Sequence, residues 1–330
     1  MKADKGQLFN IIRLNLRAML KPGKKRRKAV MTDKFLIGHA GDNDKGTGVT
    51  VILAKDGATG GVSVRGCAPG TRETDLLKNG NSVEKINAVV LSGGSAFGLD
   101  ACSGVMEYLR ERGVGFKAGG TRVPIVCGAV LYDLEYKTFA YPDKAMGYAA
   151  ASAATAGNTQ KGNVGAGIGA TVGKLAGAAC AMKGGLGIYT MPVGGAAVTA
   201  IVAVNAVGDI YDGKGSIIAG ARRGGGFVDL LSMLTEGAAS FDDGENAGKN
   251  TTIGCILTDA VLTKEQANKL ADIAHDGYAQ AIRPVHTVLD GDTVFAMASG
   301  EKKVGFIQLC AAAPECMRRA IVGAFEEAAQ

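Results

Sequence analysis

The high glycine content is the feature of this sequence that says most about its fold, because 50 of its 330 residues are glycine. A glycine has no Cβ, so it permits tight turns and lets two backbone segments approach closely. There is no collagen-like glycine repeat, and hydrophobic residues make up 47% of the chain. The sequence therefore predicts a globular protein whose elements pack closely and whose main chain a ligand can approach.

The positive charge of the chain is concentrated at its N-terminal end. The net charge is +6, but residues 1–30 contain ten Lys or Arg and one Asp, a net +9, which leaves −3 for the other 300 residues. A mildly acidic body argues against a nucleic-acid partner. Residues 8–20 could form a basic amphipathic helix on a membrane surface. We favour a dispensable extension or an early start, because the sequence from Met31 has the pattern of a natural beginning.

Cysteine, histidine and hydropathy patterns restrict the cofactors and the location of the protein. No CxxC pair occurs, and the three histidines make no zinc pattern with the cysteines. We therefore expect free thiols in the cytoplasm, with no metal and no cofactor. Neither a membrane span nor a signal peptide is predicted. The cysteines are Cys67, Cys102, Cys127, Cys180, Cys255, Cys310 and Cys316.

The first half of the chain predicts a strand, a turn and a helix, followed by a small-residue region. Residues 88–91 are apolar and run into SGGSAFGLD, which leads to a helical stretch ending near Glu111. Residues 145–210 are rich in Ala and Gly, and we expect helices packed closely on a sheet there. Within that region, residues 201–210 predict a buried strand. At the other end of the chain, a final helix is expected over residues 316–328.

A polar loop followed by an abrupt strand is the most informative junction in the sequence. Residues 236–250 are rich in Gly, Asp and Asn, and TTIGCILTDA predicts a strand that begins at Thr251. A helix follows, because Thr263 and Gln266 have the spacing of a capping box. Gly277 falls on the apolar face of that helix, which would let a neighbouring element approach closely.

Three motifs resemble familiar sites but match them incompletely. The segment GAGIGA (165–170) has dinucleotide-like spacing, but no clear strand precedes it and no acidic residue stands about 20 residues later. The pair Gly173-Lys174 lacks the first glycine and the Ser/Thr of a P-loop. Ser95 lies in GGSAFG, where Phe97 stands in place of the second glycine of a nucleophile elbow. We interpret the Ser95 segment as a tight turn, with a serine nucleophile as the alternative.

Two acidic residues flank a glycine in the segment RPVHTVLDGDTVFA. Asp290 and Asp292 could orient a base, bind a cation, or simply form a turn before a strand. The residues alone do not distinguish these roles. His286, in the same segment, is interpreted as structural.

From about His39 onward, the chain resembles the self-processing aminopeptidases and amidases typified by the L-aminopeptidase/D-amidase-esterase. The family includes the β-peptidyl aminopeptidases and the nylon-oligomer hydrolase, and the motifs are most similar to the nylon-oligomer endohydrolase branch. The matching stretches are LSGGSAFGLDA (91–101), VGAGIGATVGK (164–174), VAVNAVGDI (202–210), NTTIGCILTDA (250–260) and IRPVHTVLDGDTVFA (282–296).

The resemblance implies a role for each matched residue. Thr251 is expected to be the nucleophile, with Asp290 and Asp292 positioning its amino group and hydroxyl. Lys174 is expected to supply positive charge near the nucleophile, and Asn205 to donate a hydrogen bond to the oxyanion. Tyr132 could correspond to a tyrosine of the family that assists the reaction.

The expected chemistry begins with cleavage of the chain's own Asn250–Thr251 bond. The Thr251 hydroxyl attacks the carbonyl of Asn250 and forms an ester, which water then hydrolyses. The new α-amino group has an ordinary pKa of about 7.7–8.0, so it can accept the hydroxyl proton near neutral pH without a histidine.

The resemblance also implies the architecture. We expect an α+β fold, a four-layer αββα sandwich similar to N-terminal-nucleophile hydrolases. Residues 31–330 would form a single domain, cleaved into an α chain (31–250) and a β chain (251–330). The implied activity is hydrolysis of small amide or peptide bonds, and members of the family tend to form homo-oligomers, often tetramers.

Three other functions stay open on the sequence alone. The chain could be a serine α/β-hydrolase that uses Ser95, or a self-cleaving acyltransferase of the ornithine-acetyltransferase type. It could also be a member that binds a small molecule without turnover. An intact chain would favour the first or third of these, and acyl transfer to an amine would favour the second.

The composition break at Met31 generates a prediction. A chain that begins at Met31 should fold, cleave and hydrolyse amides normally, because the resemblance starts after that residue. Circular dichroism, gel analysis of cleavage and an amide-hydrolysis assay would check this. Loss of solubility or of cleavage in the shortened chain would show that residues 1–30 belong to the fold.

Overall fold

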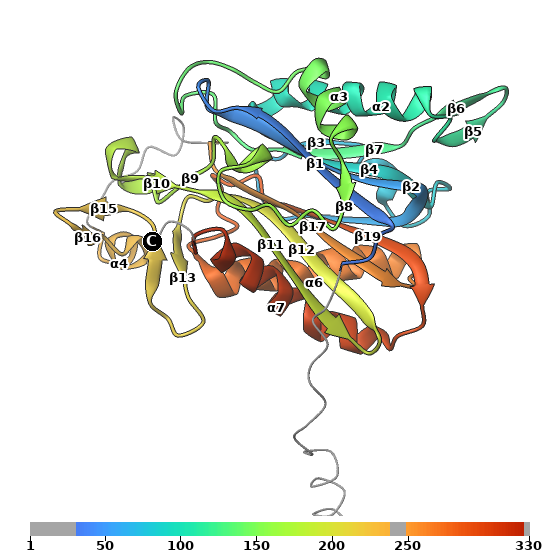
Figure 1. Ribbon diagram of the computed structural model, residues 1–330. Helices are drawn as coiled ribbons and strands as arrows, with labels where there is room; N and C mark the ends of the chain where they lie inside the picture. Colours follow the sequence, from blue (N-terminus) through green and yellow to red (C-terminus); the bar gives the residue numbers. More distant parts are fainter. Residues whose placement is uncertain (1–30, 238–248, 327–330) are drawn as a thin grey trace, which may run out of the picture.

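The computed structural model describes residues 31–237 and 249–326. The proposed N-terminal extension 1–30, most of the polar loop before Thr251, and the last residues of the chain lie outside the described residues. In the described part, helices cover both faces of a central pair of β layers (Figure 1).

Ten strands form one continuous hydrogen-bonded sheet that folds over on itself. The order is β11-β12-β17-β19-β2-β4-β7-β3, and β1 pairs with β2 and β8. The long strand β2 (Thr47–Val64) joins the two layers: its first half pairs with β1, its second half pairs with β19, and β4 pairs with it across a register shift between Leu53 and Ala58. The first layer also contains β1 Phe35–Asp42, β3 Gly70–Arg72, β4 Lys85–Ser92, β7 Val126–Val130 and β8 Thr155–Ala156. The second layer contains β11 Gly185–Val193, β12 Ala196–Asn205, β17 Thr251–Ala260 and β19 Thr293–Lys302.

Three separate hydrophobic cores establish the four layers. The central core lies between the two β layers, where Leu91 of β4 and Ile201 of β12 belong to the same cluster. Because side chains alternate along a strand, the neighbouring Val90 and Val202 point outward, each into a core beneath helices. The outer helices are α2 Ala101–Glu111 and α3 Lys144–Ser152 on the first layer, and α6 Lys264–Ala281 and α7 Phe306–Gly323 on the second. The expected αββα sandwich is therefore confirmed.

The remaining elements are short and lie around this sandwich. The smaller strands are β5 Phe116–Ala118, β6 Thr121–Val123, β9 Thr171–Val172, β10 Met182–Lys183, β13 Asp209–Tyr211, β14 Ile217–Ala219, β15 Arg222–Arg223, β16 Gly226–Phe227 and β18 Ile282–Arg283. One short α-helix, α4, spans Leu230–Thr235. The 3₁₀ turns are η1 Asp75–Leu77, η2 Ser95–Asp100, η3 Gly165–Gly167, η4 Lys174–Ala176 and η5 Ala178–Cys180.

Helix α6 begins and packs as its sequence predicts. The Thr263 hydroxyl accepts a hydrogen bond from the Gln266 N–H at 3.2 Å, and the Gln266 side chain accepts one from the Thr263 N–H at 3.0 Å. This is the predicted capping box. Gly277 faces α7, where an added Cβ would clash with the Pro314 carbonyl and lie 2.8 Å from Cβ of Met317. Close approach of the two helices therefore depends on the missing side chain.

Three predictions about secondary structure were wrong or incomplete. Residues 145–210 contain only one α-helix, α3, and then turns and strands, because glycines such as Gly157 and Gly173 adopt positive φ and interrupt any helix. The single strand predicted over residues 201–210 is two strands, since β12 ends at Asn205 and β13 begins at Asp209. The final helix begins at Phe306, ten residues early, and contains Pro314 in its interior.

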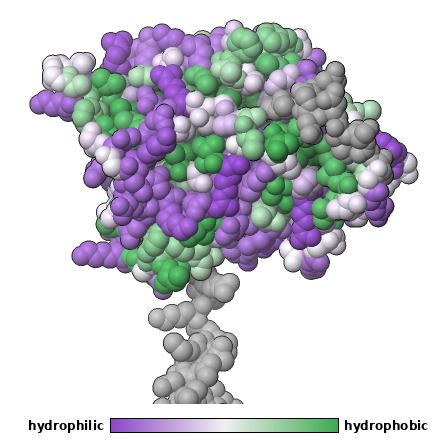
Figure 2. Space-filling view, turned by 180° about the vertical axis from the view of Figure 1, so that it is seen from behind, coloured by the Kyte–Doolittle hydropathy of each residue, from purple (hydrophilic) through white to green (hydrophobic). Residues whose placement is uncertain are grey.

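The surface mixes polar and apolar groups. One face of the molecule shows apolar side chains interspersed with hydrophilic ones (Figure 2), as is usual for a globular protein surface. Among the helices that the structure describes, none is long and apolar enough to cross a membrane.

The contact between α6 and α7 gives a prediction about stability. Gly277→Ala should destabilise the fold by up to about 2 kcal/mol, because overpacking costs roughly 1–3 kcal/mol and the gain in helix propensity offsets only about 1 kcal/mol of it. Thermal unfolding would measure the effect. Gly120→Ala is the matched control, since an added Cβ at Gly120 meets nothing within 4 Å. Equal melting temperatures for the two variants would contradict the packing argument.

Candidate active site

Thr251 is the first residue of β17, a central strand of the second layer. Strand β17 pairs antiparallel with β12, which sets Asn205 opposite Thr251, and parallel with β19. Thr251 and Asn250 are each only 2% exposed. The strand therefore begins at Thr251 as predicted, and the peptide bond that precedes it is buried in the sheet.

Two donors surround the carbonyl oxygen of Asn250. The hydroxyl of Thr251 donates to it at 2.5 Å, and the backbone N–H of Gly291 donates to it at 2.9 Å. Gly291 has no room for a side chain, because a Cβ there would lie 2.8 Å from the Thr251 hydroxyl and 2.6 Å from the Ala68 carbonyl oxygen. A side-chain hydroxyl and a backbone donor thus meet at one carbonyl group.

Asp290 and Asp292 lie on either side of Gly291 and are both buried. One carboxylate oxygen of Asp292 accepts a hydrogen bond from the Thr252 N–H at 2.7 Å. Burial and the negative charge of Asp292 raise the pKa of the Asp290 carboxyl. The pair is therefore part of the surroundings of Thr251, and its direct contact there is with the neighbouring amide of Thr252.

A backbone loop holds this acidic turn from behind. The amides of Arg65 and Gly66 donate to the Asp292 carbonyl at 3.0 and 3.2 Å, and the Ala68 amide donates to the Asp290 carbonyl at 3.0 Å. These three hydrogen bonds fix the main chain that bears the two carboxylates. The turn is therefore more than a simple surface connection into β19.

Lys174, which is partly buried, and Asn205, which is fully buried, form a second group beside Thr251. The Lys174 ammonium donates to the Asn205 side-chain oxygen at 2.9 Å, to the Asn205 carbonyl at 3.0 Å and to the Lys249 carbonyl at 3.0 Å. Burial lowers the pKa of Lys174 to about 7. The Asn205 oxygen also accepts from the Thr171 N–H at 3.0 Å.

The orientation of the Asn205 amide follows from these donors. Because its oxygen faces Lys174 and Thr171, its NH₂ group must face the opposite way. That group donates to the Tyr132 carbonyl at 3.2 Å and to the Lys249 carbonyl at 3.4 Å. Asn205 and Lys174 therefore share the carbonyl of Lys249, one residue before the Asn250 carbonyl.

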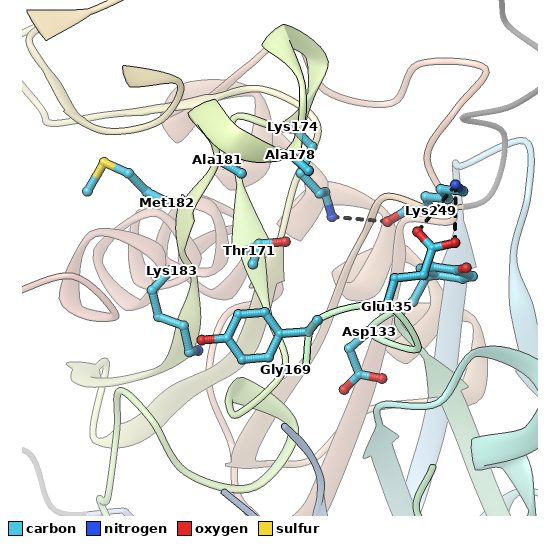
Figure 3. Close-up of a pocket in the computed structure, with 12 residues that line it drawn as sticks. Asp133, Glu135, Gly169, Thr171, Lys174, Ala178, Ala181, Met182, Lys183 and Lys249 are labelled. Atoms are coloured by element: carbon cyan, nitrogen blue, oxygen red, sulfur yellow. Dashed lines mark hydrogen bonds and ion pairs between the residues drawn. The ribbon is translucent and has the colours of Figure 1, made fainter. Parts of the chain in front are cut away.

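A cavity of about 410 Å³ opens beside these residues (Figure 3). A smaller cavity of about 200 Å³ shares part of its wall and extends to Asn250. The ammonium of Lys249 pairs with the Glu135 carboxylate at 3.4 Å. The larger cavity is lined by Tyr132, Asp133, Glu135, Tyr136, Gly169, Thr171, Lys174, Ala178, Ala181, Met182, Lys183 and Lys249.

Asp133 lies at the wall of the larger cavity and is almost completely buried. Its carboxylate accepts hydrogen bonds from the Thr47 hydroxyl at 2.8 Å and the Gly94 N–H at 2.6 Å. Burial raises the pKa of Asp133 to about 6. Asp133 therefore connects the cavity to the turn that contains Ser95.

Ser95 itself lacks the surroundings of an activated nucleophile. It has a positive φ of 51°, and its N–H donates to the Leu131 carbonyl. In the part of the chain that the structure describes, no base is hydrogen-bonded to its hydroxyl. The geometry around Ser95 fits the tight turn that the sequence predicts.

The structure brings the expected residues together in one connected group. It joins Thr251, Asp292 and Asn205 through β17 and its two neighbours, with Asp290 and Lys174 beside them. Two partners were missed from the sequence: the Gly291 N–H and the Lys249 carbonyl. Both are main-chain groups, so no side-chain motif could have indicated them.

A protein-family comparison matches residues 32–330 to peptidase family S58. The chain belongs to peptidase family S58. An uncharacterised aminopeptidase of Mycobacterium leprae is 39% identical over 83% of this chain and 81% of its own length. A 6-aminohexanoate-oligomer endohydrolase of Kocuria sp. is 34% identical over 80% of this chain and 73% of its own length.

Solved structures agree with the fold of this S58 member. The L-aminopeptidase D-Ala-esterase/amidase of Ochrobactrum anthropi, described as a variant of the Ntn hydrolase fold, superimposes with a TM-score of 0.64 at 16% identity, covering 89% of this chain and 84% of that one. A β-aminopeptidase of Burkholderia sp. gives 0.61 at 21% identity, covering 94% and 90%. The fold is thus of the Ntn hydrolase type, and family membership makes the protein a hydrolase of amide or peptide bonds.

Proposed function

We propose that this chain cleaves its own Asn250–Thr251 bond and then uses Thr251 as an N-terminal nucleophile against small amides or peptides. The observation that supports this most strongly is the contact of the Thr251 hydroxyl with the Asn250 carbonyl, which the Gly291 N–H also binds. A hydroxyl and a backbone donor on the same buried carbonyl are what acyl transfer requires.

Self-cleavage would proceed in two balanced steps. The Thr251 oxygen attacks the Asn250 carbonyl carbon, and negative charge develops on the carbonyl oxygen beside the Gly291 N–H. The C–N bond then breaks, the leaving nitrogen takes the hydroxyl proton, and an ester remains. Water hydrolyses that ester, which leaves a carboxylate on Asn250 and a free amino group and hydroxyl on Thr251.

The charged residues around Thr251 have distinct parts in this proposal. Asp292, bound to the Thr252 N–H, fixes the start of β17. Asp290, which forms a bridge with Asn250, adds negative charge near the place where the new amino group of Thr251 would form. Lys174 offsets the charge of Asp290, because its ammonium lies close enough to act on that carboxylate. After cleavage, the amino group of Thr251 acts as the base for its own hydroxyl.

Cleavage would also prepare the site for an external substrate. In the intact chain, the Lys249 carbonyl occupies the donors of both Lys174 and Asn205. Once the Asn250–Thr251 bond is broken, residues 249–250 are no longer tied to β17, and these donors can bind the carbonyl oxygen of a substrate. Removing one donor of this kind costs about 3–4 kcal/mol of barrier where it has been measured.

The substrate is proposed only by its chemical class. The cavity of about 410 Å³ beside Lys174 supports a small acyl group. Relatives are named as aminopeptidases and as 6-aminohexanoate-oligomer endohydrolases. Peptides, β-peptides and ω-amino-acid oligomers therefore all belong to the proposed range, and a panel of p-nitroanilides and short oligoamides would separate them.

The organisation of the protein follows from the same proposal. Chains 31–250 and 251–330 would stay together as one folding unit, because β17 and β19 are enclosed by strands of the first chain. We expect a homo-oligomer, with a tetramer as the first state to test by light scattering. All seven cysteines are free thiols, which supports the reducing environment of the cytoplasm.

Substitutions at Thr251 test the nucleophile. Thr251→Ala should remain a single chain without amidase activity, because it lacks the hydroxyl that both reactions need. Thr251→Ser should keep some cleavage, since its hydroxyl remains. Gel analysis over time, with circular dichroism to check folding, would measure both.

Ser95→Ala is the matched control for this series, and it should still cleave. The proposal would be wrong if Ser95→Ala were folded but inert while Thr251→Ala still hydrolysed amides. That result would support the serine-hydrolase alternative.

The titration of the buried charges predicts how self-cleavage depends on pH. The rate should fall as Lys174 loses its proton near pH 7, because positive charge beside the site disappears. It should also fall on the acid side as Asp290 is protonated, at a pH above the ordinary carboxyl value of about 4, since its pKa is raised. Cleavage rates of purified precursor across pH would test this, and Lys174→Met should be slow and lack the alkaline limb. A flat profile would contradict these roles.

A further inference from the structure

Two adjacent residues, His286 and Thr287, contact the two buried carboxylates of the site. Thr287 donates to one oxygen of Asp290 twice, from its N–H at 2.9 Å and from its hydroxyl at 2.7 Å. His286 does the same to one oxygen of Asp292, from its N–H at 3.2 Å and from its ring Nδ1 at 2.8 Å. Each residue therefore gives one backbone and one side-chain donor to a single carboxylate oxygen.

We propose that His286 and Thr287 are positioning residues that orient Asp292 and Asp290 for the reaction at Thr251. This inference rests on the proposed function and extends it to residues outside the catalytic group. We call residues 286–287 the carboxylate clamp.

The clamp leaves the second oxygen of Asp292 free to accept a hydrogen bond from β17. That oxygen accepts the Thr252 N–H at 2.7 Å, so a continuous path of hydrogen bonds leads from His286 through Asp292 to the residue after Thr251. The negative charge of Asp292 also raises the pKa of Asp290, and the two Thr287 donors oppose this by favouring the charged form of Asp290. The contacts of the carboxylate clamp therefore hold both carboxylates in position, and those of Thr287 also favour the charged form of Asp290.

The backbone at His286 adapts to this arrangement. Its φ is +56°, in the left-handed region that residues with a Cβ rarely adopt. This conformation lets its N–H and its ring nitrogen reach the same oxygen of Asp292. Strain that persists beside a reactive group is consistent with a functional constraint on the chain.

Two neighbouring aromatic rings and a hydrogen bond from Nδ1 hold the ring of His286 in place. The His275 ring lies 4.8 Å away, edge to face, and the Tyr278 ring lies 5.9 Å away. Because the acceptor is a carboxylate, Nδ1 must hold the proton. The other nitrogen, Nε2, is buried without a hydrogen-bond partner among the residues that the structure describes. The ring can therefore do little at this position except donate to Asp292.

The test for His286 compares two substitutions that both tolerate a positive φ. Asn at position 286 can place an amide donor near the position of Nδ1, whereas Gly keeps the backbone N–H and removes the side-chain donor. His286→Gly should slow self-cleavage by roughly 10- to 100-fold, the loss expected for one hydrogen bond to a charged group. His286→Asn should recover most of that rate. Equal rates for the two variants, fast or slow, would overturn the role of the His286 ring.

The test for Thr287 uses the shape of the side chain as its control. Thr287→Val keeps the shape and the N–H but removes the hydroxyl donor to Asp290, whereas Thr287→Ser keeps the donor. The hydroxyl also accepts from the Leu289 N–H at 3.2 Å, so melting temperatures of both variants are measured. Thr287→Val should cleave roughly 10- to 100-fold more slowly than Thr287→Ser.

A pH profile distinguishes this role from a purely structural one. The Thr287 hydroxyl lowers the pKa of Asp290, so Thr287→Val should move the acid limb of self-cleavage to higher pH. The other charged groups that act on Asp290 are Asp292 and Lys174, and the substitution leaves both in place. An acid limb identical to that of the natural chain would overturn the inference, provided that the natural chain cleaves. If the natural chain itself fails to cleave, the proposed function fails instead.

Discussion

The hydrogen-bond ladder of β17 determines what can surround Thr251. Because β17 and β19 run parallel, the residues before the two strands meet at the same edge, and Asn250 forms a bridge with Asp290 there. The antiparallel partner β12 ends at Asn205, directly opposite Thr251. Three segments distant in the sequence therefore converge on one peptide bond. The site follows from strand register more than from any flexible loop.

Such convergence buries several charges at once, and the arrangement has to offset the cost of removing them from water. Lys174 and Asp290 interact here, and burial changes the pKa of both groups toward neutrality. Each charged group also has main-chain partners, including the Lys249 carbonyl and the Thr252 amide. An isolated charge here would be strongly destabilising, whereas this group is paired and hydrogen-bonded. The same pairing leaves titratable groups near neutral pH, where they can affect a reaction.

Much of the local structure could be predicted from the sequence, because local rules decide it. The capping box at Thr263, the strand at Thr251 and the close contact at Gly277 all follow from residue type and spacing. The prediction of helices over residues 145–210 was wrong, because the glycines there permit helix, turn and strand alike. Only tertiary pairing selects among these conformations. The site residues were expected from a family resemblance. The roles of the Gly291 amide and the Lys249 carbonyl could not be predicted, because a main-chain group acquires its role only from the surrounding fold.

The central claim is that the buried Asn250–Thr251 bond is a substrate of the chain that contains it. Intact-mass spectrometry of the purified protein, followed over time at neutral pH, tests this most directly. The account predicts two polypeptides that replace the full-length chain, one ending at Asn250 and one beginning at Thr251. A single full-length mass that persists after long incubation would contradict it.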